Sequence, residues 1–363
     1  MTSSVYIHIP FCEKICSYCD FCKMFYNEKL VDQYLDKLED EINSLYKGEL
    51  IKTLYIGGGT PSSLNIRQLE KLFKIISVFK LNSSYEATIE CNFSNTTKEK
   101  LELFKKYGIN RLSFGLETIN SKQLEFLERD ESKDNTCFII QTAKDLGFKN
   151  INVDLMYALP GESIEDLCKD LEFIKSLDIE HVSCYSLIVE EHTKLGISNT
   201  KNIDSDLDFE MYQMICKFMK DNGFNHYEIS NYAKEGYESR HNLVYWNNEE
   251  YYGFGLGASS YLDNKRCTNT RSISSYLKGS YLLDTEILEK DDLVYYEVML
   301  NLRKSSGIDL DKLYSLYKVK LDYNELVNLG LLELDDNKLY IPENKWYISN
   351  DIIIRLLEGV IYE

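Results

Sequence analysis

The sequence predicts an α/β protein in which a partial (β/α)6 barrel precedes a smaller, mainly helical C-terminal domain. Two observations lead to this fold class. Short runs rich in β-branched and aromatic residues alternate with helical patterns before residue 206, and this repetition implies parallel strands joined by right-handed crossovers. After residue 285 the pattern becomes mostly helical. A chain of 363 residues is long enough for one large domain with an appendage.

The predicted strands are short β-rich runs, and the predicted helices between them repeat apolar residues at i, i+3 and i+4. The strands are expected at residues 5–9, 53–56, 85–90, 110–114, 150–155 and 181–186. The helices are expected at residues 30–45, 66–78, 97–107, 135–146 and 164–177. In a barrel of this kind the functional groups gather where the strands end.

The rest of the chain adds two further units, so that the expected division is 1–205, 206–285 and 286–363. The middle unit begins with a helix to residue 222, continues in a strand near 227–229, and completes the barrel with aromatic, glycine-rich segments. The last unit looks like a small winged-helix-like appendage with a hairpin near 332–341. Its acidity argues against DNA binding.

Composition excludes several classes of function. The formal net charge of −18 opposes sequence-independent binding to phosphate backbones, so we expect no nucleic-acid partner. The chain starts without a basic region or a long apolar stretch, and no run of about eighteen apolar residues occurs in it. We therefore expect a cytoplasmic protein with no integral membrane segment, whose cysteines do not form a disulfide framework.

Three cysteines lie in one loop directly after the first predicted strand: Cys12, Cys16 and Cys19, spaced C-x3-C-x2-C. Three thiolates can hold a 4Fe–4S cluster and leave one iron open to another ligand. Cys22 extends the run to four thiols, so a structural zinc site or a closed electron-transfer cluster is also compatible with the spacing. The residues alone leave the choice between three and four ligands open.

Glycine and polar residues recur at the ends of later strands. The second strand runs into three glycines, residues 57–59, where backbone N–H groups can approach a ligand closely. Glu90, Glu117 and Asp154 follow three other strands and could accept hydrogen bonds from a ribose or an amino group. Arg129 could pair with a carboxylate through two hydrogen bonds. Together these residues favour one site around the barrel mouth.

At these residues a resemblance to a known family becomes specific. Segments 6–12 (Y-x-H-I-P-F-C), 18–21 (Y-C-D-F) and 57–62 (G-G-G-T-P-S) resemble the radical S-adenosylmethionine (SAM) superfamily. More narrowly, they resemble its oxygen-independent coproporphyrinogen-III-oxidase-like group. The resemblance continues through segments 111–115, 154–161, 227–231, 241–246 and 253–258, and so covers most of the chain. It implies a partial TIM-like radical SAM barrel.

The resemblance implies that Cys12, Cys16 and Cys19 ligate a 4Fe–4S cluster whose fourth iron chelates SAM. An electron from the cluster would then cleave the sulfonium bond of SAM. Two positions depart from the family pattern: Glu117 stands where Gln is usual, and acidic residues replace the His that follows the equivalent of Arg129. The implied SAM contacts are Tyr6, Tyr18, Gly58, Gly59, Thr60, Glu90, Glu117, Arg129 and Asp154.

Within this group the chain resembles the HemW-type heme chaperones. True coproporphyrinogen oxidases carry a fourth Cys in a C-x-C arrangement, whereas Asp20 and Phe21 follow Cys19 here. The segment 241–246 (H-N-L-V-Y-W) resembles a heme-binding segment, which implies that His241 is an axial ligand to heme iron. The implied partners are heme, acceptor hemoproteins and an electron donor to the cluster. The sequence does not decide whether the protein forms a homodimer.

Two other functions stay open beside a heme chaperone. The first is an enzyme of porphyrin biosynthesis that decarboxylates the propionate side chains of coproporphyrinogen III oxidatively. The second is a simple iron–sulfur electron carrier, which the glycine-rich loop disfavours. The sequence leaves open whether SAM is cleaved in turnover or only bound.

Overall fold

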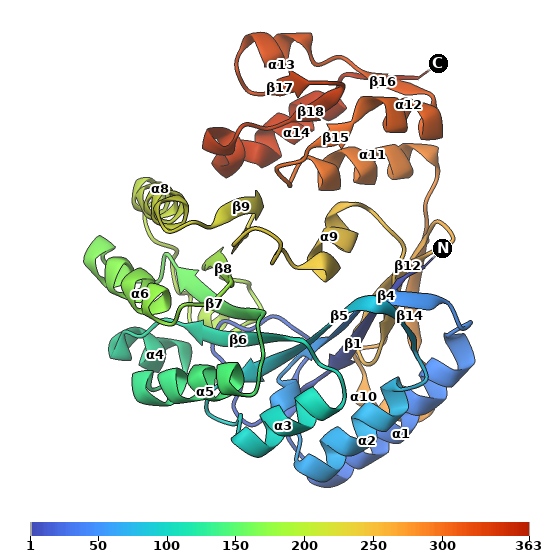
Figure 1. The fold of residues 1–363 in the computed structure, drawn as a ribbon. Coiled ribbons are helices and arrows are strands. Elements are labelled where there is room, and N and C mark those ends of the chain that lie inside the picture. Colours follow the sequence, from blue (N-terminus) through green and yellow to red (C-terminus); the bar gives the residue numbers. More distant parts are fainter. Residues whose placement is uncertain (1, 363) are drawn as a thin grey trace.

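The centre of the molecule is an open barrel of parallel strands with helices on its outside (Figure 1). The structure is a computed structural model and describes residues 2–362. One nine-stranded sheet has the order β11-β1-β4-β5-β6-β7-β8-β10-β9, parallel from β11 to β8 and antiparallel from β8 to β9. Its strands are β1 (Ser4–Ile9), β4 (Leu50–Gly58), β5 (Lys80–Asn92), β6 (Arg111–Glu117), β7 (Ile151–Tyr157), β8 (His181–Ser186), β9 (Asn225–Glu228), β10 (Asn231–Ala233) and β11 (Tyr252–Phe254).

The six predicted barrel strands are confirmed, although β4 and β5 extend further than their apolar runs. The three residues of β11 were predicted only as part of a glycine-rich segment. In the structure β11 pairs in parallel with β1, with Tyr252 opposite Val5. This pairing covers the edge of the first strand and is too short to leave a periodic signal in the sequence.

Helices cover the outer face of the parallel strands. Two of them begin with a capping box, in which Asn65 pairs with Gln68 and Ser163 pairs with Asp166. The fourth helix is a seven-residue segment that was not predicted. The outer helices are α1 (Glu28–Leu45), α2 (Ile66–Ile76), α3 (Lys98–Lys106), α4 (Ser121–Leu127), α5 (Lys133–Asp145) and α6 (Ile164–Ser176).

Strand register brings distant polar residues to the same level of the barrel. Gly58 on β4 lies opposite Ile9 at the end of β1. Asp154 on β7 lies opposite Gly115 on β6 and opposite Ser183 on β8. The carboxyl ends of these strands therefore present their side chains to one common space.

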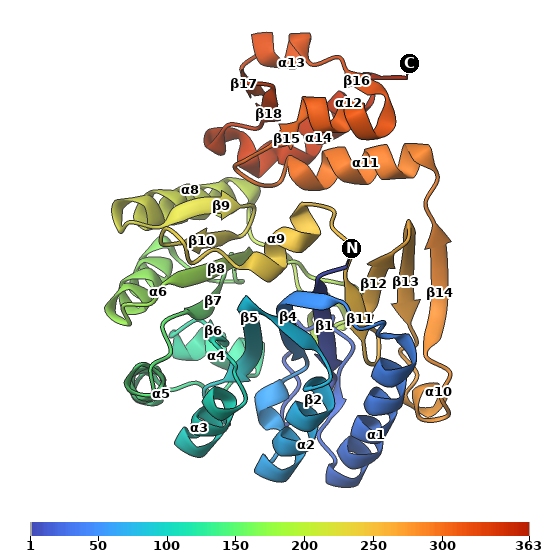
Figure 2. The ribbon, with the colours of Figure 1, turned by 45° about the vertical axis from the view of Figure 1, so that its right-hand side comes forward.

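The chain after β8 adds a helical layer and a second small sheet. Figure 2 shows the antiparallel strands β12, β13 and β14 beside the barrel. The elements of this region are α7 (Lys194–Ile197), α8 (Ser205–Asp221), α9 (Arg240–Trp246), β12 (Ser259–Leu262), β13 (Lys265–Asn269), α10 (Ile273–Leu277) and β14 (Leu282–Ile287).

The C-terminal unit has a hydrophobic core of its own, which includes Val298 and Trp346. The predicted hairpin is confirmed as the antiparallel pair β17 and β18. The division of the chain into three units stays a prediction. The elements of the C-terminal unit are α11 (Lys290–Asn301), β15 (Ile308–Asp309), α12 (Leu310–Tyr317), β16 (Val319–Leu321), α13 (Asn324–Asn328), β17 (Glu333–Asp335), β18 (Lys338–Tyr340), the 3-10 helix η2 (Glu343–Ile348), α14 (Ser349–Leu357) and β19 (Val360–Tyr362).

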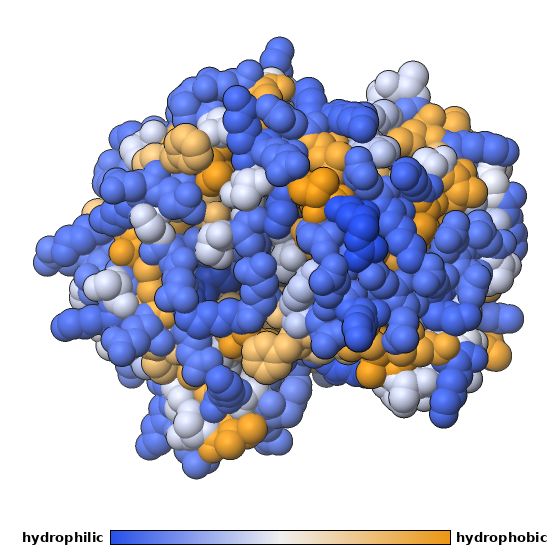
Figure 3. All heavy atoms as spheres, turned by 90° about the horizontal axis from the view of Figure 1, so that it is seen from below, coloured by the Kyte–Doolittle hydropathy of each residue, from blue (hydrophilic) through white to orange (hydrophobic). Residues whose placement is uncertain are grey.

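The structure shows how polar and apolar side chains are distributed on one face of the molecule (Figure 3). The face in Figure 3 is mainly hydrophilic, and its apolar side chains form separate small groups. Within residues 2–362, no helix combines the length and the apolar content that crossing a membrane requires.

Candidate functional site at the barrel mouth

The cysteine loop is held between two short parallel strands, β2 (Phe11–Cys12) and β3 (Met24–Phe25). At its base the N–H of Met24 donates to the carbonyl oxygen of Pro10 at 2.7 Å. At its tip the N–H of Ser17 donates to the carbonyl oxygen of the last residue of α4 at 3.2 Å. The loop is therefore fixed across the carboxyl ends of the barrel strands.

The structure separates the fourth cysteine from the other three. Cys12, Cys16 and Cys19 line one cavity of about 430 Å³ together with residues from the strand ends. Cys22 instead lines a second cavity, where its side chain lies beside Gly257 and Arg271. A set of three thiolates can thus face the main cavity while Cys22 points elsewhere.

The loop thiols are not already gathered as closely as the ligands of a zinc ion. Tetrahedral zinc with Zn–S bonds of about 2.3 Å holds its sulfur ligands about 3.8 Å apart. Within residues 2–362, one group of metal-binding side chains has all its ligand atoms within 4.8 Å of one another, and it contains none of the four loop cysteines. A 4Fe–4S cluster takes one thiolate per iron and accepts a wider spacing.

Burial keeps two of the loop thiols protonated as long as no metal ion lies beside them. Burial raises the pKa of Cys12 to about 11, although the hydroxyl of Thr60 donates to its sulfur at 3.6 Å. Burial also raises the pKa of Cys19. Arg129 Nη1 lies 3.5 Å from Cys16 Sγ. Metal binding must displace the thiol protons and would keep the thiolates charged.

The glycine turn after β4 packs directly against the cysteine loop. The N–H of Gly59 donates to the carbonyl oxygen of Ile9 at 2.8 Å, and a Cβ on Gly59 would lie 2.9 Å from Cys12 Sγ. Gly58 has φ of +118°, and a Cβ there would lie 2.6 Å from the ring of His8. Glycine is therefore required at both positions, because a larger residue would push the turn away from the loop.

Two half-buried carboxyl groups face the cavity from β5 and β7, the strands on either side of β6. Glu90 accepts hydrogen bonds from the hydroxyl of Tyr55 at 2.8 Å and from the N–H of Gly58 at 2.9 Å. Burial raises the pKa of Glu90 to about 7. Asp154 accepts a hydrogen bond from Asn152 Nδ2 at 2.8 Å, and burial raises its pKa as well. A cationic ligand would stabilise the ionised form of these carboxyl groups.

A buried arginine forms the opposite wall. Arg129 Nη1 lies 3.5 Å from Glu117 Oε1, and its Nη2 lies 3.3 Å from Glu131 Oε1. Among the described residues, Arg129 Nε has no hydrogen-bond partner. Burial raises the pKa of Glu117 to about 7, and Glu117 has a left-handed φ of 66° where a β-bulge interrupts the pairing of β6. The strained backbone turns this carboxylate toward Arg129.

The sequence analysis missed several inward-facing residues of the cavity. Arg111, Asn152 and Asn242 line it, with Tyr55, Ser113, Ser183 and Tyr185. In β7 the polar residues Asn152 and Asp154 alternate with buried apolar ones. This period of two within a buried parallel strand marks the side chains that point into a barrel, and it could have identified them.

Most of the predicted SAM contacts meet at this cavity, and one does not. Tyr18, Gly58, Gly59, Thr60, Glu90, Glu117, Arg129 and Asp154 all line it. Tyr6 lines the second cavity, of about 400 Å³, and its hydroxyl lies 3.0 Å from His8 Nδ1. The individual roles of these residues stay predictions.

The predicted heme ligand lies behind the cavity wall. His241 is 1% exposed in the first turn of α9, and its ring stacks on Tyr55. Its Nδ1 lies 2.8 Å from Thr53 Oγ1, and its Nε2 lies 2.8 Å from the hydroxyl of Tyr245. Burial lowers the pKa of His241 to about 3. The ring is neutral, as an iron ligand must be, but both of its nitrogens are engaged.

Known proteins resemble this chain in sequence and in fold. Residues 6–174 match the radical SAM superfamily. Heme chaperone HemW of Lactococcus lactis subsp. lactis is 36% identical over 98% of this chain and 97% of its own length. Heme chaperone HemW of Bacillus subtilis is 38% identical over 96% of this chain and 97% of its own length. The solved structure of coproporphyrinogen III oxidase (HemN) from Escherichia coli, a radical SAM enzyme, has the same fold, with a TM-score of 0.87 and 22% identity over 97% of this chain and 89% of its own. This chain therefore belongs to the HemW heme chaperone family within the radical SAM superfamily.

Proposed function

We propose that this protein is a cytoplasmic heme chaperone, which binds a 4Fe–4S cluster, SAM and heme and passes heme to acceptor hemoproteins. One observation carries this proposal: relatives named heme chaperone HemW are similar over nearly the full length of both chains. The position at which true oxidases carry a further Cys is Phe21 in this chain. That difference supports a chaperone rather than a porphyrin-modifying enzyme.

The residues of the main cavity fit a cluster and SAM. Cys12, Cys16 and Cys19 would hold the cluster, because they face one cavity. A cluster held by these thiolates and reduced by an external electron donor would supply the electron that cleaves the sulfonium bond of SAM. The cavity wall carries carboxyl groups for cationic parts of the ligand.

Arg129 supports recognition of the carboxylate of SAM. Its buried Nε has no partner within the described chain, so a ligand carboxylate could complete its hydrogen bonds. Glu117 and Glu131 compete for the same guanidinium, since both carboxylates contact it. We therefore propose that Arg129 exchanges part of its contact with Glu117 for the ligand when SAM binds.

Heme binding through His241 would require a local rearrangement. The Nε2 of His241 would have to leave the hydroxyl of Tyr245, while the hydrogen bond from Nδ1 to Thr53 could keep the ring oriented. The segment is short, seven residues in α9, and is followed by a glycine-containing strand. We propose that His241 becomes available when the end of α9 moves.

The test separates a chaperone from an oxidase. Anaerobically reconstituted protein is mixed with heme, separated from unbound heme, and then offered an apo-hemoprotein such as apomyoglobin. We expect stoichiometric heme binding and transfer to the acceptor. In parallel the protein is incubated with SAM, a reductant and coproporphyrinogen III. Formation of protoporphyrinogen, or the absence of bound heme, would contradict the proposal.

A further inference from the structure

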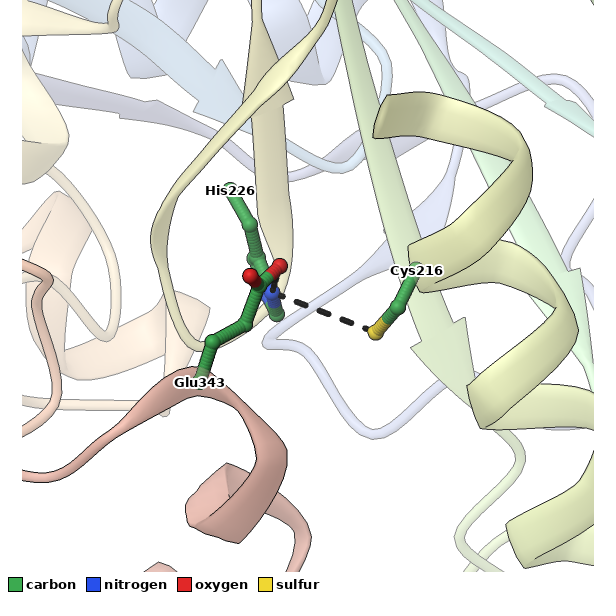
Figure 4. A group of neighbouring side chains, drawn as sticks. All are labelled: Cys216, His226 and Glu343. Carbon is green, nitrogen blue, oxygen red and sulfur yellow. Dashed lines mark hydrogen bonds and ion pairs between the residues drawn. The ribbon is translucent and has the colours of Figure 1, made fainter. Parts of the chain in front are cut away.

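A thiol, an imidazole and a carboxylate converge far from the barrel mouth, where the C-terminal unit meets the barrel (Figure 4). Cys216 lies on α8, His226 on β9, and Glu343 is the first residue of η2. Their ligand atoms lie within 4.8 Å of one another. His226 Nδ1 is 3.5 Å from Glu343 Oε1 and 4.0 Å from Cys216 Sγ.

The second nitrogen of His226 indicates which tautomer is present. Its Nε2 lies 3.4 Å from the carbonyl oxygen of Ile229, which can only accept a hydrogen bond. The proton of a neutral ring therefore sits on Nε2, and Nδ1 presents a lone pair to Glu343. Two acceptors then face each other at 3.5 Å. A second proton on Nδ1 would make this contact an ion pair, in line with the pKa of Glu343, which the hydrogen bond with His226 lowers, and a metal ion would fit between the same two atoms.

We propose that Cys216, His226 and Glu343 bind a zinc ion. Thiolate, imidazole and carboxylate are the three side-chain ligands that zinc uses in proteins. The hydrogen bond from Nε2 to a backbone carbonyl is the outer contact that orients a metal-binding histidine. The site supplies three protein ligands and leaves the fourth position to water, because the Glu343 side chain is 46% exposed.

The side chains need only small shifts to take tetrahedral positions. Ligand atoms around zinc lie about 3.3–3.6 Å apart, given bond lengths of about 2.0–2.3 Å. The contact between His226 and Glu343 already has this length, and the contact between Cys216 and His226 is slightly longer. Burial raises the pKa of Cys216, so zinc must displace the thiol proton, and the hydroxyl of Tyr232, 3.3 Å away, can donate to the thiolate.

The zinc ion would fasten the C-terminal unit to the barrel. Glu343 comes from the C-terminal unit, whereas Cys216 and His226 come from the helix and strand next to it. The ring of Trp346 already packs 4.4 Å from the ring of His226. Binding a metal only in the folded arrangement stabilises that arrangement by linkage. The site therefore acts as a clamp between the two units.

Metal analysis on the complete protein tests this proposal. Wild type is reconstituted anaerobically until its iron content is constant, incubated with zinc sulfate, passed through a desalting column and analysed for zinc and iron. The iron–sulfur cluster then occupies the loop cysteines, so these thiols cannot bind the added zinc. The variants are Cys216→Ser and Glu343→Gln, and Cys168→Ser is the matched control because Cys168 is an exposed thiol on α6.

We expect about one zinc per chain in wild type and in Cys168→Ser, and at least a threefold loss in Cys216→Ser and Glu343→Gln. Glu343 is half exposed, so its replacement by Gln should not impair folding. Zinc should also raise the midpoint of thermal unfolding of wild type and not that of Glu343→Gln. Equal zinc contents and equal midpoints in all four proteins would overturn the proposal. So would cobalt(II) bound by wild type without a thiolate charge-transfer band in the difference spectrum against Cys216→Ser.

Discussion

Two buried regions of this protein differ in whether their polar side chains have hydrogen-bond partners. At the barrel mouth, Arg111 and Arg129 each keep an Nε without a partner among the described residues. In the first turn of α9, His241 has a partner on both ring nitrogens. A buried polar group without a partner destabilises a protein unless a ligand satisfies it. The barrel mouth is therefore prepared for a ligand, whereas His241 must give up a hydrogen bond before it can bind one.

Removing a cluster ligand should have the largest effect. Cys16→Ala takes one of three thiols from the main cavity, so we expect the reconstituted protein to lose most of its roughly four irons per chain. Cys22→Ala should keep its iron, because Cys22 lines the second cavity. Iron and acid-labile sulfide analysis measures both variants. Equal loss in the two variants would mean that four thiolates hold the metal.

The second-largest effect is expected from replacing Arg129, the buried cation, which should weaken SAM binding. In Arg129→Ala the charge-assisted hydrogen bonds to the ligand disappear, and each is worth about 1.5–3 kcal/mol. We expect the dissociation constant for SAM, measured by equilibrium dialysis, to rise at least about tenfold. Arg67→Ala is the matched control, since Arg67 pairs with Glu28 and Asp32 at the surface. Unchanged affinity in Arg129→Ala would remove this residue from the SAM site.

Removing the hydrogen bond between Tyr245 and His241 should strengthen heme binding. Tyr245→Phe removes the hydrogen bond to His241 Nε2, which is worth about 1 kcal/mol, so we expect heme affinity to rise about fivefold. In His241→Ala the heme spectrum should lose the features of an imidazole ligand. Heme titration followed by absorbance measures both. If both variants bind heme as wild type does, heme lies elsewhere and α9 is only structural.

Replacing Glu117, which stands where Gln is usual in the family, should change the affinity for SAM by a smaller factor. Glu117→Gln keeps the size of the side chain but removes the charge that lies 3.5 Å from Arg129 Nη1. The guanidinium is then less fully paired, so we expect SAM to bind about threefold more tightly, a difference of about 0.7 kcal/mol. Glu99→Gln, at an exposed site in the first turn of α3, is the control. Weaker binding in Glu117→Gln would show that the carboxylate itself contacts SAM.

The smallest expected effect is on stability as a function of pH. Burial raises the pKa of Glu90 and Glu117 to about 7 and that of Glu162 to about 8, so the folded protein holds protons that the unfolded chain releases above pH ~4.5. Their contribution to stability is lost as the pH rises through 7 and 8. Burial lowers the pKa of His8 to about 4 and of His241 to about 3, and their contribution is lost below pH ~6.5.

The cluster-free, ligand-free protein should therefore be most stable near pH ~5, because above it the three carboxyl groups lose more stability than the two histidines gain, and it should unfold at a lower temperature at pH 8. Thermal unfolding across this range measures the effect. Glu162→Gln removes one titrating group outside the main cavity and should flatten the fall between pH 6 and 8. A midpoint that rises steadily to pH 8 would contradict these assignments.

The sequence predicted the barrel well because each strand and helix carries its own periodic pattern. The strand at residues 5–9 is mostly apolar, the strand at 150–155 alternates polar and apolar residues, and α2 shows the 3.6-residue period on one face. β11 and α4 were not predicted, since three and seven residues are too few to show a period. Their formation depends on packing against β1 and the cysteine loop.

The site was predictable where its residues are adjacent in the chain, and less so where the barrel brings them together. The cysteine loop and the glycine turn are local motifs. The hydrogen bonds of His241 to Thr53 and the contact of Glu343 with His226 join residues more than 100 positions apart, and no local pattern records them. The side to which Cys22 points depends on the loop conformation, and the side to which Tyr6 points depends on its place in β1.

The most direct test is electron paramagnetic resonance of the reduced, reconstituted protein with and without SAM, recorded for wild type and for Cys22→Ala. We predict a 4Fe–4S signal in both proteins, and a clear change in that signal when SAM is added to either. A signal that SAM leaves unchanged, or a cluster that disappears in Cys22→Ala, would contradict three-thiolate ligation with one iron open to the barrel mouth.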